Sequence, residues 1–197
     1  MVKVNVSGCA SFADAAKYQQ YVAKAIKAQQ VLKAGNGAGN DFLGWRVLPS
    51  GTPESLVAAC EAVRDDWAGR GVDLVIAVGI GGSYLGAKCV IEALSHNFAK
   101  QLRTRKAAEV VFAGNNLSED YLSELMDLAA ERNVACIVIS KSGTTTEPAV
   151  VFRLVKDYIE KTYKDASERI VAITDAQRGA LKVLSRHFPT RKDTAVS

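Results

Sequence analysis

Residues 139–147, which read ISKSGTTTE, carry five hydroxyl groups and one ammonium group within seven consecutive positions. The oxygen atoms of a phosphate group accept hydrogen bonds, and hydroxyl and ammonium groups are suitable donors to them. The alternative is an ordinary polar turn in which one threonine caps the next helix. If the segment holds an anion, the candidate donors are Ser140, Lys141, Ser142, Thr144 and Thr145.

A second candidate segment is the glycine-rich turn at residues 79–86, which reads GIGGSYLG. Bare glycines let backbone N–H groups approach an anion, and the start of a helix adds positive potential. The turn fails as a dinucleotide fingerprint because Tyr84 takes the place of the third glycine, and it fails as a P-loop because Lys88 comes one position too late. The turn therefore presents Gly82 and Ser83 either to an anion or as a plain helix cap.

Both segments follow short apolar runs that alternate with helical patterns from residue 73 onward. Strands that are apolar on both faces and separated by helices indicate a parallel sheet between two helical layers. We therefore predict an α/β fold, a three-layer αβα sandwich with a mostly parallel sheet of flavodoxin-like strand order. In such folds ligands bind outside the carboxyl ends of the strands. The predicted strands are residues 73–79, 109–114, 134–140 and 169–175.

The first 72 residues have helical patterns without strands. Residues 12–33 are rich in Ala, Lys and Gln, and a second helix begins at Thr52 and Pro53. We divide the chain into a helical segment, residues 1–72, a sandwich, residues 73–187, and an irregular tail, residues 188–197. Spacings of three and four predict buried faces at Leu56, Cys60, Val63 and Trp67, and at Ala87, Ile91, Leu94 and Phe98.

The composition argues against several classes of function. A net charge of +4 is too weak for a nucleic-acid partner, and the basic cluster at residues 103–106 is expected to be a solvated loop. No apolar run approaches 18 residues, so no membrane helix is predicted. The four cysteines are far apart, and with only two histidines their spacing supports no zinc site. We expect a cytoplasmic protein without a metal.

The two candidate segments together resemble the signature loops of the glucose-6-phosphate isomerase family. The stretches GNGAGNDFLGWRVLP and NNLSEDY are also similar to that family, and the resemblance runs over residues 10–185. It implies a sugar isomerase (SIS) domain and the interconversion of glucose 6-phosphate and fructose 6-phosphate through a cis-enediol, in glycolysis and gluconeogenesis. It also implies that no metal or organic cofactor is needed and that the full-length enzyme is a homodimer.

The resemblance assigns a role to each candidate donor. It implies that the hydroxyls of Ser83, Ser140, Ser142 and Thr145 contact the substrate phosphate, that Lys141 and Thr144 contribute mainly through their backbone, and that Gly82 lies near the sugar. The family's catalytic glutamate, histidine and lysine lie in a second SIS domain, which no segment here matches. Neither Glu147 nor His187 is assigned to catalysis. We expect an N-terminal portion that binds sugar phosphates without turnover and has no catalytic residue of its own.

Three other functions are compatible with parts of the pattern. A stand-alone SIS module, either a regulatory domain that senses a sugar phosphate or a different sugar-phosphate isomerase, would share the hydroxyl-rich loop, but it would not be expected to carry GNDFLGW or a helical N-terminal layer. A Rossmann oxidoreductase is disfavoured by the missing third glycine and the missing acidic residue after the second strand. In a non-catalytic interaction domain, the polar loops would be helix caps only.

Overall fold

The computed structural model describes residues 3–9, 11–12, 14–99, 102, 107–175 and 179–187. It divides into two compact units, Met1–Thr52 and Pro53–Ser197. The division therefore falls about twenty residues before the boundary expected at residue 72, and the helix that follows Pro53 belongs to the second unit. The basic cluster at residues 103–106 and the tail at residues 188–197 lie outside the described residues.

The first unit consists of one long helix and several short ones. Helix α1 (Ala15–Ala34) begins where the Asp14 side chain accepts a hydrogen bond from the Ala16 amide, and it ends at Gly35, whose φ of 66° is the usual left-handed helix stop. Three short 3₁₀ turns and α2 complete it: η1 (Ser7–Cys9), η2 (Asn40–Phe42), η3 (Gly44–Arg46) and α2 (Leu48–Gly51). None of the described residues of this unit is buried.

The second unit is built on a four-stranded sheet in the described part of the chain. Strands β1 (Leu74–Val78), β2 (Glu109–Ala113), β3 (Val134–Ile139) and β4 (Ile170–Ile173) pair in parallel in the order β2-β1-β3-β4. The helices are α3 (Glu54–Gly69), α4 (Gly82–Leu94), α5 (Glu119–Ala130), α6 (Thr146–Thr162) and α7 (Ala180–His187), with a 3₁₀ turn η4 (Ala166–Arg169) before β4. The α/β class and the flavodoxin-like strand order are confirmed.

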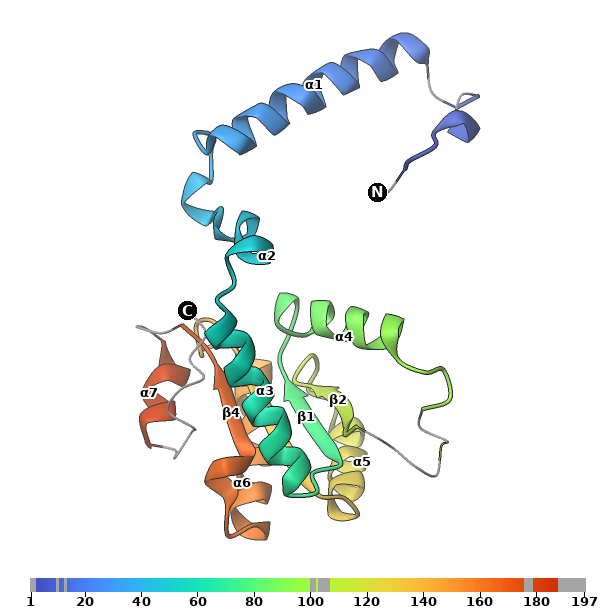
Figure 1. Cartoon of the computed structure of the whole chain (residues 1–197). Coiled ribbons are helices and arrows are strands. Elements are labelled where there is room, and N and C mark those ends of the chain that lie inside the picture. Colours follow the sequence, from blue (N-terminus) through green and yellow to red (C-terminus); the bar gives the residue numbers. More distant parts are fainter. Residues whose placement is uncertain are drawn as a thin grey trace. The chain divides into compact units, whose positions relative to one another are not determined.

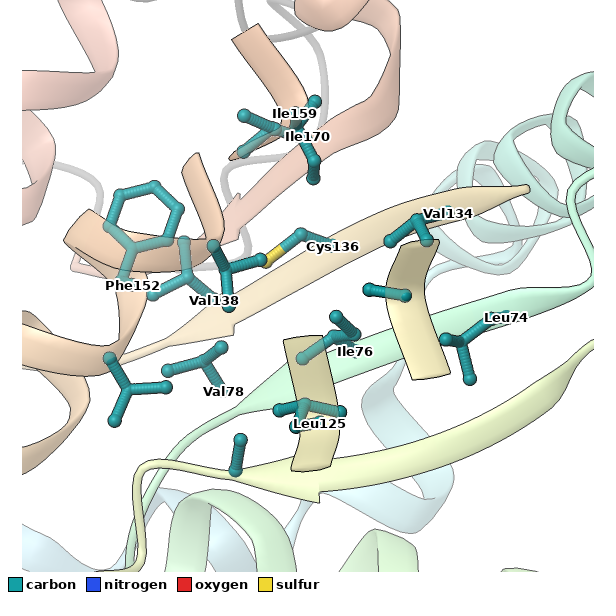
Figure 2. Close-up of a cluster of buried hydrophobic side chains, with 14 of the residues drawn as sticks. Leu74, Ile76, Val78, Leu125, Val134, Cys136, Val138, Phe152, Ile159 and Ile170 are labelled. Atoms are coloured by element: carbon teal, nitrogen blue, oxygen red, sulfur yellow. The ribbon is translucent and has the colours of Figure 1, made fainter. Parts of the chain in front are cut away.

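The sheet is covered on both faces, as a three-layer sandwich requires. On one face the side chains of β1 and β3 pack against Leu125 of α5 and against Phe152 and Ile159 of α6 (Figure 2). On the other face Val63 and Trp67 of α3 pack against the strands, and in Figure 1 α3 lies across the sheet. This packing explains why α3 groups with the sheet rather than with the helical segment.

Helix α4 differs from the prediction in the side that it turns to the sheet. The predicted buried face is wrong, because Leu94 is 83% exposed and Phe98 is 65% exposed. Of the predicted positions on α4 only Ile91 is half-buried, and the other half-buried residues of the helix are Ser83, Tyr84 and Lys88. Apolar residues occur all round α4, so the spacing alone could not select the covered side.

The cysteines also divide differently from the prediction. Cys60, which was expected on a buried face, is exposed, as is Cys89, whereas Cys136 is fully buried in β3. Burial raises the pKa of the Cys136 thiol, so it remains protonated and packs as a small hydrophobic group. In the described part of the chain, no helix is both long enough and apolar enough to cross a membrane.

Charged and polar side chains are paired at the amino end of the sheet. The buried Arg169 guanidinium donates to the Asp165 carboxylate at 2.8 Å, to the Asn133 side chain at 2.6 Å and to the Val134 carbonyl at 3.0 Å. It also lies over the Tyr163 ring, 3.9 Å from the centroid. This network joins the segments that lead into β3 and β4.

Candidate functional site

The two donor-rich segments lie at the carboxyl ends of neighbouring strands. Strand order reverses between β1 and β3, because the chain moves outward to β2 on one side and to β4 on the other. Val78 and Val138 are register partners, so the loops that follow these strands start side by side (Figure 1). Ligands of open parallel sheets bind at this kind of reversal. The fold therefore brings together the two segments that sequence analysis selected.

Glycines allow three strand-to-helix loops to pack tightly at this edge. A Cβ on Gly79 would lie 3.1 Å from the Ser83 Cβ and 3.4 Å from the carbonyl oxygen of Ile139. A Cβ on Gly114, after β2, would lie 3.0 Å from the Cα of Pro148. Ser83 is thus held next to the end of β3, where the hydroxyl-rich loop begins.

The first loop presents backbone and a serine hydroxyl without capping its helix. Gly81 adopts φ 57° and ψ −126°, which favours glycine, and it precedes α4 without a side-chain cap. Ser83 is the second residue of α4, and its amide donates to the Ile80 carbonyl at 3.1 Å. Its hydroxyl has no hydrogen-bond partner among the described residues, and Gly82 is exposed. The plain serine cap considered above is therefore not what this loop forms.

The second loop, residues 140–145, is partly ordered by its own hydroxyls. Ser140 is buried, and its Oγ accepts a hydrogen bond from the Gly143 amide at 3.0 Å. Ser142 is exposed, and its Oγ accepts from the amide and from the hydroxyl of Thr144, at 3.3 and 3.0 Å. The loop therefore has a defined shape before any ligand binds.

Two groups of the second loop remain available for a ligand. Thr145 is the N-cap residue of α6, yet its side chain makes no capping hydrogen bond, contrary to the expectation that one threonine would serve as the cap. Lys141 is exposed, and within the described residues its ammonium group forms no ion pair. Glu147 lies in the first turn of α6, where a carboxylate favours the helix dipole.

The site suits an anion and no metal. Two helices of 13 and 17 residues, α4 and α6, begin at this edge, and the first turn of each helix has unsatisfied N–H groups and positive potential. In the described ranges no group of three or more His, Cys, Asp or Glu side chains could hold a metal ion. Hydroxyl groups, an ammonium group and helix N-termini can bind a phosphate monoester.

A neighbouring cavity lies outside the anion site. It has a volume of about 950 Å³ and lies between α4 and β2, where Tyr84, Phe112 and Asn115 contribute to its lining. None of the seven candidate residues lines it. Beside it, Tyr121 donates its hydroxyl to the Phe112 carbonyl at 2.7 Å, and burial raises the pKa of this phenol, so it acts as a structural hydrogen-bond donor.

Sequence analysis missed the residues that hold the second loop from the side of α7. The Ala180 amide donates to the Ser142 carbonyl at 3.1 Å, and Leu181 packs directly against Gly143. The only local signal in the sequence was Gly143 itself, whose φ of 68° marks a position that favours glycine.

Comparisons with known proteins agree with this geometry. A sequence model of the family described as phosphoglucose isomerase matches residues 53–183. The glucose-6-phosphate isomerase of Shouchella clausii is 47% identical over 174 residues, covering 84% of this chain and 38% of that protein. The glucose-6-phosphate isomerase of Parabacteroides distasonis is 47% identical over 165 residues, covering 83% of this chain and 37% of that protein.

One solved structure shows the same fold. The crystal structure of a hypothetical protein from Thermus thermophilus superimposes with a TM-score of 0.70 at 22% sequence identity, covering 87% of this chain and 38% of that chain. The chain thus spans less than two fifths of the length of the relatives it matches.

Proposed function

Because the chain belongs to the phosphoglucose isomerase family, we propose that it is part of an enzyme that interconverts glucose 6-phosphate and fructose 6-phosphate, and that it binds the substrate phosphate. One observation supports the proposal that the chain binds the substrate phosphate. Two donor-rich loops from distant parts of the sequence meet where the strand order reverses, and hydroxyls of both loops are left without partners in the described residues.

In this proposal the phosphate group lies between the first turns of α4 and α6. Ser83 donates from the first loop, and Ser142 and Thr145 donate from the second. Ser140 is buried and accepts from Gly143, so it mainly holds the loop, while its own proton remains free to reach the phosphate. The flanking positions are Gly82, Lys141 and Thr144: the first two add backbone N–H groups and one positive charge, and Thr144, whose amide and hydroxyl donate to Ser142, holds the loop in shape.

Binding of the substrate phosphate contributes to the isomerisation indirectly. Moving a proton between C1 and C2 through a cis-enediol needs a base beside those carbons, and none of the candidate residues is an acid or an imidazole. The phosphate is remote from the reacting atoms, so binding it orients the sugar and supplies binding energy for the reaction. In this proposal the base belongs to the second SIS domain that the resemblance implies, so the chain alone binds substrate without turning it over.

Three further features of the complete enzyme follow from the resemblance. It is a cytoplasmic homodimer, it uses no metal or organic cofactor, and residues 73–187, together with α3, form its first SIS domain. A stand-alone sensor module has less support, because the relatives match 83% and 84% of this chain, including part of the helical segment.

A thermal-shift titration of the 197-residue chain tests the proposal. Fructose 6-phosphate, inorganic phosphate and NAD are compared in parallel. A ligand at about a hundred times its dissociation constant stabilises the fold by about 2.7 kcal/mol, which corresponds to about 5–11 °C in Tm. We expect a clear shift with fructose 6-phosphate, a smaller one with phosphate and none with NAD. A shift with NAD alone would contradict the proposal.

A further inference from the structure

We propose that the first turn of α7 positions the second loop for phosphate binding, and that Leu181 controls the affinity for phosphate without touching the ligand. This inference rests on the proposed function, because it concerns the same phosphate site. It assigns a positioning role to α7, which contains none of the candidate donors.

Hydrogen bonds tie two carbonyls of the loop to Thr174, just after β4, and to Ala180, the first residue of α7. The Ser142 carbonyl accepts from the Ala180 amide at 3.1 Å, and the Lys141 carbonyl accepts from the Thr174 hydroxyl at 3.5 Å. In a trans peptide the carbonyl and the following N–H point in opposite directions. Fixing these two carbonyls toward α7 therefore turns the amides of Ser142 and Gly143 the other way.

The amides of Gly143 and Ser142 differ in their hydrogen bonding. The Gly143 amide, which belongs to the same peptide as the Ser142 carbonyl, donates to the buried Ser140 Oγ at 3.0 Å. The Ser142 amide, which follows the Lys141 carbonyl, donates to no other described residue. It is an N–H donor that the Thr174 hydrogen bond, beside the close approach of Gly179, has oriented for a ligand.

Two glycines make this close contact possible. A Cβ on Gly143 would overlap the backbone nitrogen of Leu181, and a Cβ on Gly179 would lie 2.8 Å from the Ser142 carbonyl oxygen. The φ angles of these glycines are 68° and 105°, where other residues are strained. No larger residue fits at either position without moving the loop or α7.

Leu181 anchors the contact in the core. It is only 3% exposed and belongs to the cluster that fills the α5–α6 face of the sheet. Its burial keeps the neighbouring Ala180 amide against the Ser142 carbonyl. A loop that is ordered before binding loses less conformational freedom when the phosphate arrives, so the contact raises affinity through pre-organisation.

The test compares two buried leucines of the same cluster. Leu181→Ala and Leu125→Ala each remove a side chain that is 3% or 4% exposed, but only Leu181 lies beside the phosphate loop. Both variants should lower Tm by several degrees. The dissociation constants for fructose 6-phosphate and inorganic phosphate are then measured by calorimetry. We expect Leu181→Ala to raise them about tenfold and Leu125→Ala to change them less than about twofold.

Hydrogen exchange without ligand provides a readout that general destabilisation does not explain. In Leu181→Ala the amides of Gly143 and Ala180 should exchange faster than in Leu125→Ala at matched stability. Gly179→Ala keeps Leu181 and should give the same two effects, so it serves as the second variant if Leu181→Ala does not fold.

The binding measurements distinguish a wrong proposed function from a wrong positioning role for α7. If the unchanged chain binds neither phosphate ligand, the proposed function is wrong and this inference falls with it. If the unchanged chain binds, and the variants at Leu181 and Gly179 bind as tightly as Leu125→Ala, only the positioning role is wrong.

Discussion

The two ends of the sheet in the second unit use their polar groups in opposite ways. At the amino end the Arg169 guanidinium is buried and makes three hydrogen bonds, and Arg70 pairs with Asp66 and Asp165 at 2.9 and 2.7 Å. At the carboxyl end the hydroxyls of Ser83 and Thr145 have no partner among the described residues.

The polar groups at the amino end of the sheet contribute to stability, whereas those at the carboxyl end are available for binding. Buried polar groups must be paired, because an unpaired one costs about 1–3 kcal/mol, so the amino end is filled with internal partners. Groups at an exposed edge are satisfied by water and can exchange that water for a ligand. Changes at the amino end should therefore alter folding, and changes at the carboxyl end should alter binding.

Arg169→Met should give the largest effect and should act on stability alone. Removing the guanidinium leaves the partly buried Asp165 carboxylate and the Asn133 side chain without their main donor, so the free energy of unfolding should fall by about 3–5 kcal/mol. Urea denaturation measures this loss. Arg64→Met is the control, because Arg64 is exposed and surface ion pairs contribute little to stability. Equal losses in the two variants would contradict the comparison.

Replacing Ser142 and Thr145 together by alanine should abolish most phosphate binding while leaving stability nearly unchanged. Each hydrogen bond to a charged group contributes about 1.5–3 kcal/mol, so the dissociation constant for fructose 6-phosphate should rise at least about a hundredfold. Calorimetric titration measures the affinity. The control is Ser55→Ala with Ser123→Ala, which removes two exposed hydroxyls elsewhere. Unchanged affinity in the first double variant would mean that the loop is only a polar turn.

Ser83→Ala should weaken binding about tenfold, because it removes one hydroxyl from the less hydroxyl-rich loop. Since Ser83 does not cap α4, the melting temperature should stay within about 1–2 °C of the unchanged chain. The same titration and a thermal melt measure both quantities. A loss of stability without a loss of affinity would make the first loop a structural turn.

Acidification should give the smallest effect and should act at the amino end. The hydrogen bond from Arg169 holds the pKa of the Asp165 carboxyl below its ordinary value of about 3.9. The stabilisation is therefore complete above that value and is lost as the pH falls through the lower pKa of the folded chain. Because Asp165 is 36% exposed, solvent screening keeps the effect small. Denaturation of Asp165→Asn and the unchanged chain should differ at about pH 7 and converge near about pH 2, whereas a constant difference would contradict this.

The strands could be predicted, and the candidate residues of the second loop could be selected, because their signals are local in the sequence. Each strand is a continuous apolar run, and the donors of the second loop are consecutive residues. The covered side of α4 could not be predicted, because exposed apolar residues, Leu85, Val90 and Leu94, are interspersed with the half-buried Tyr84 and Ile91. Only tertiary packing selects among those sides.

The contact between Gly143 and Leu181 could not be predicted either, because it joins two loops that are distant in sequence. The sequence also predicted a threonine cap for α6, and Thr145 does occupy the N-cap position, but its side chain makes no capping hydrogen bond. The capping preference of threonine is a local tendency, and here the loop conformation leaves the Thr145 hydroxyl uncommitted. What the sequence could not reveal was therefore tertiary contact.

The most direct test of the phosphate site is an amide chemical-shift map of the 197-residue chain titrated with fructose 6-phosphate. The account predicts that the largest shifts fall on Gly82, Ser83 and residues 141–147, that inorganic phosphate shifts the same amides, and that the Arg169 region stays unchanged. Saturable shifts confined to other parts of the chain, such as the cavity between α4 and β2, would contradict the assignment of the site.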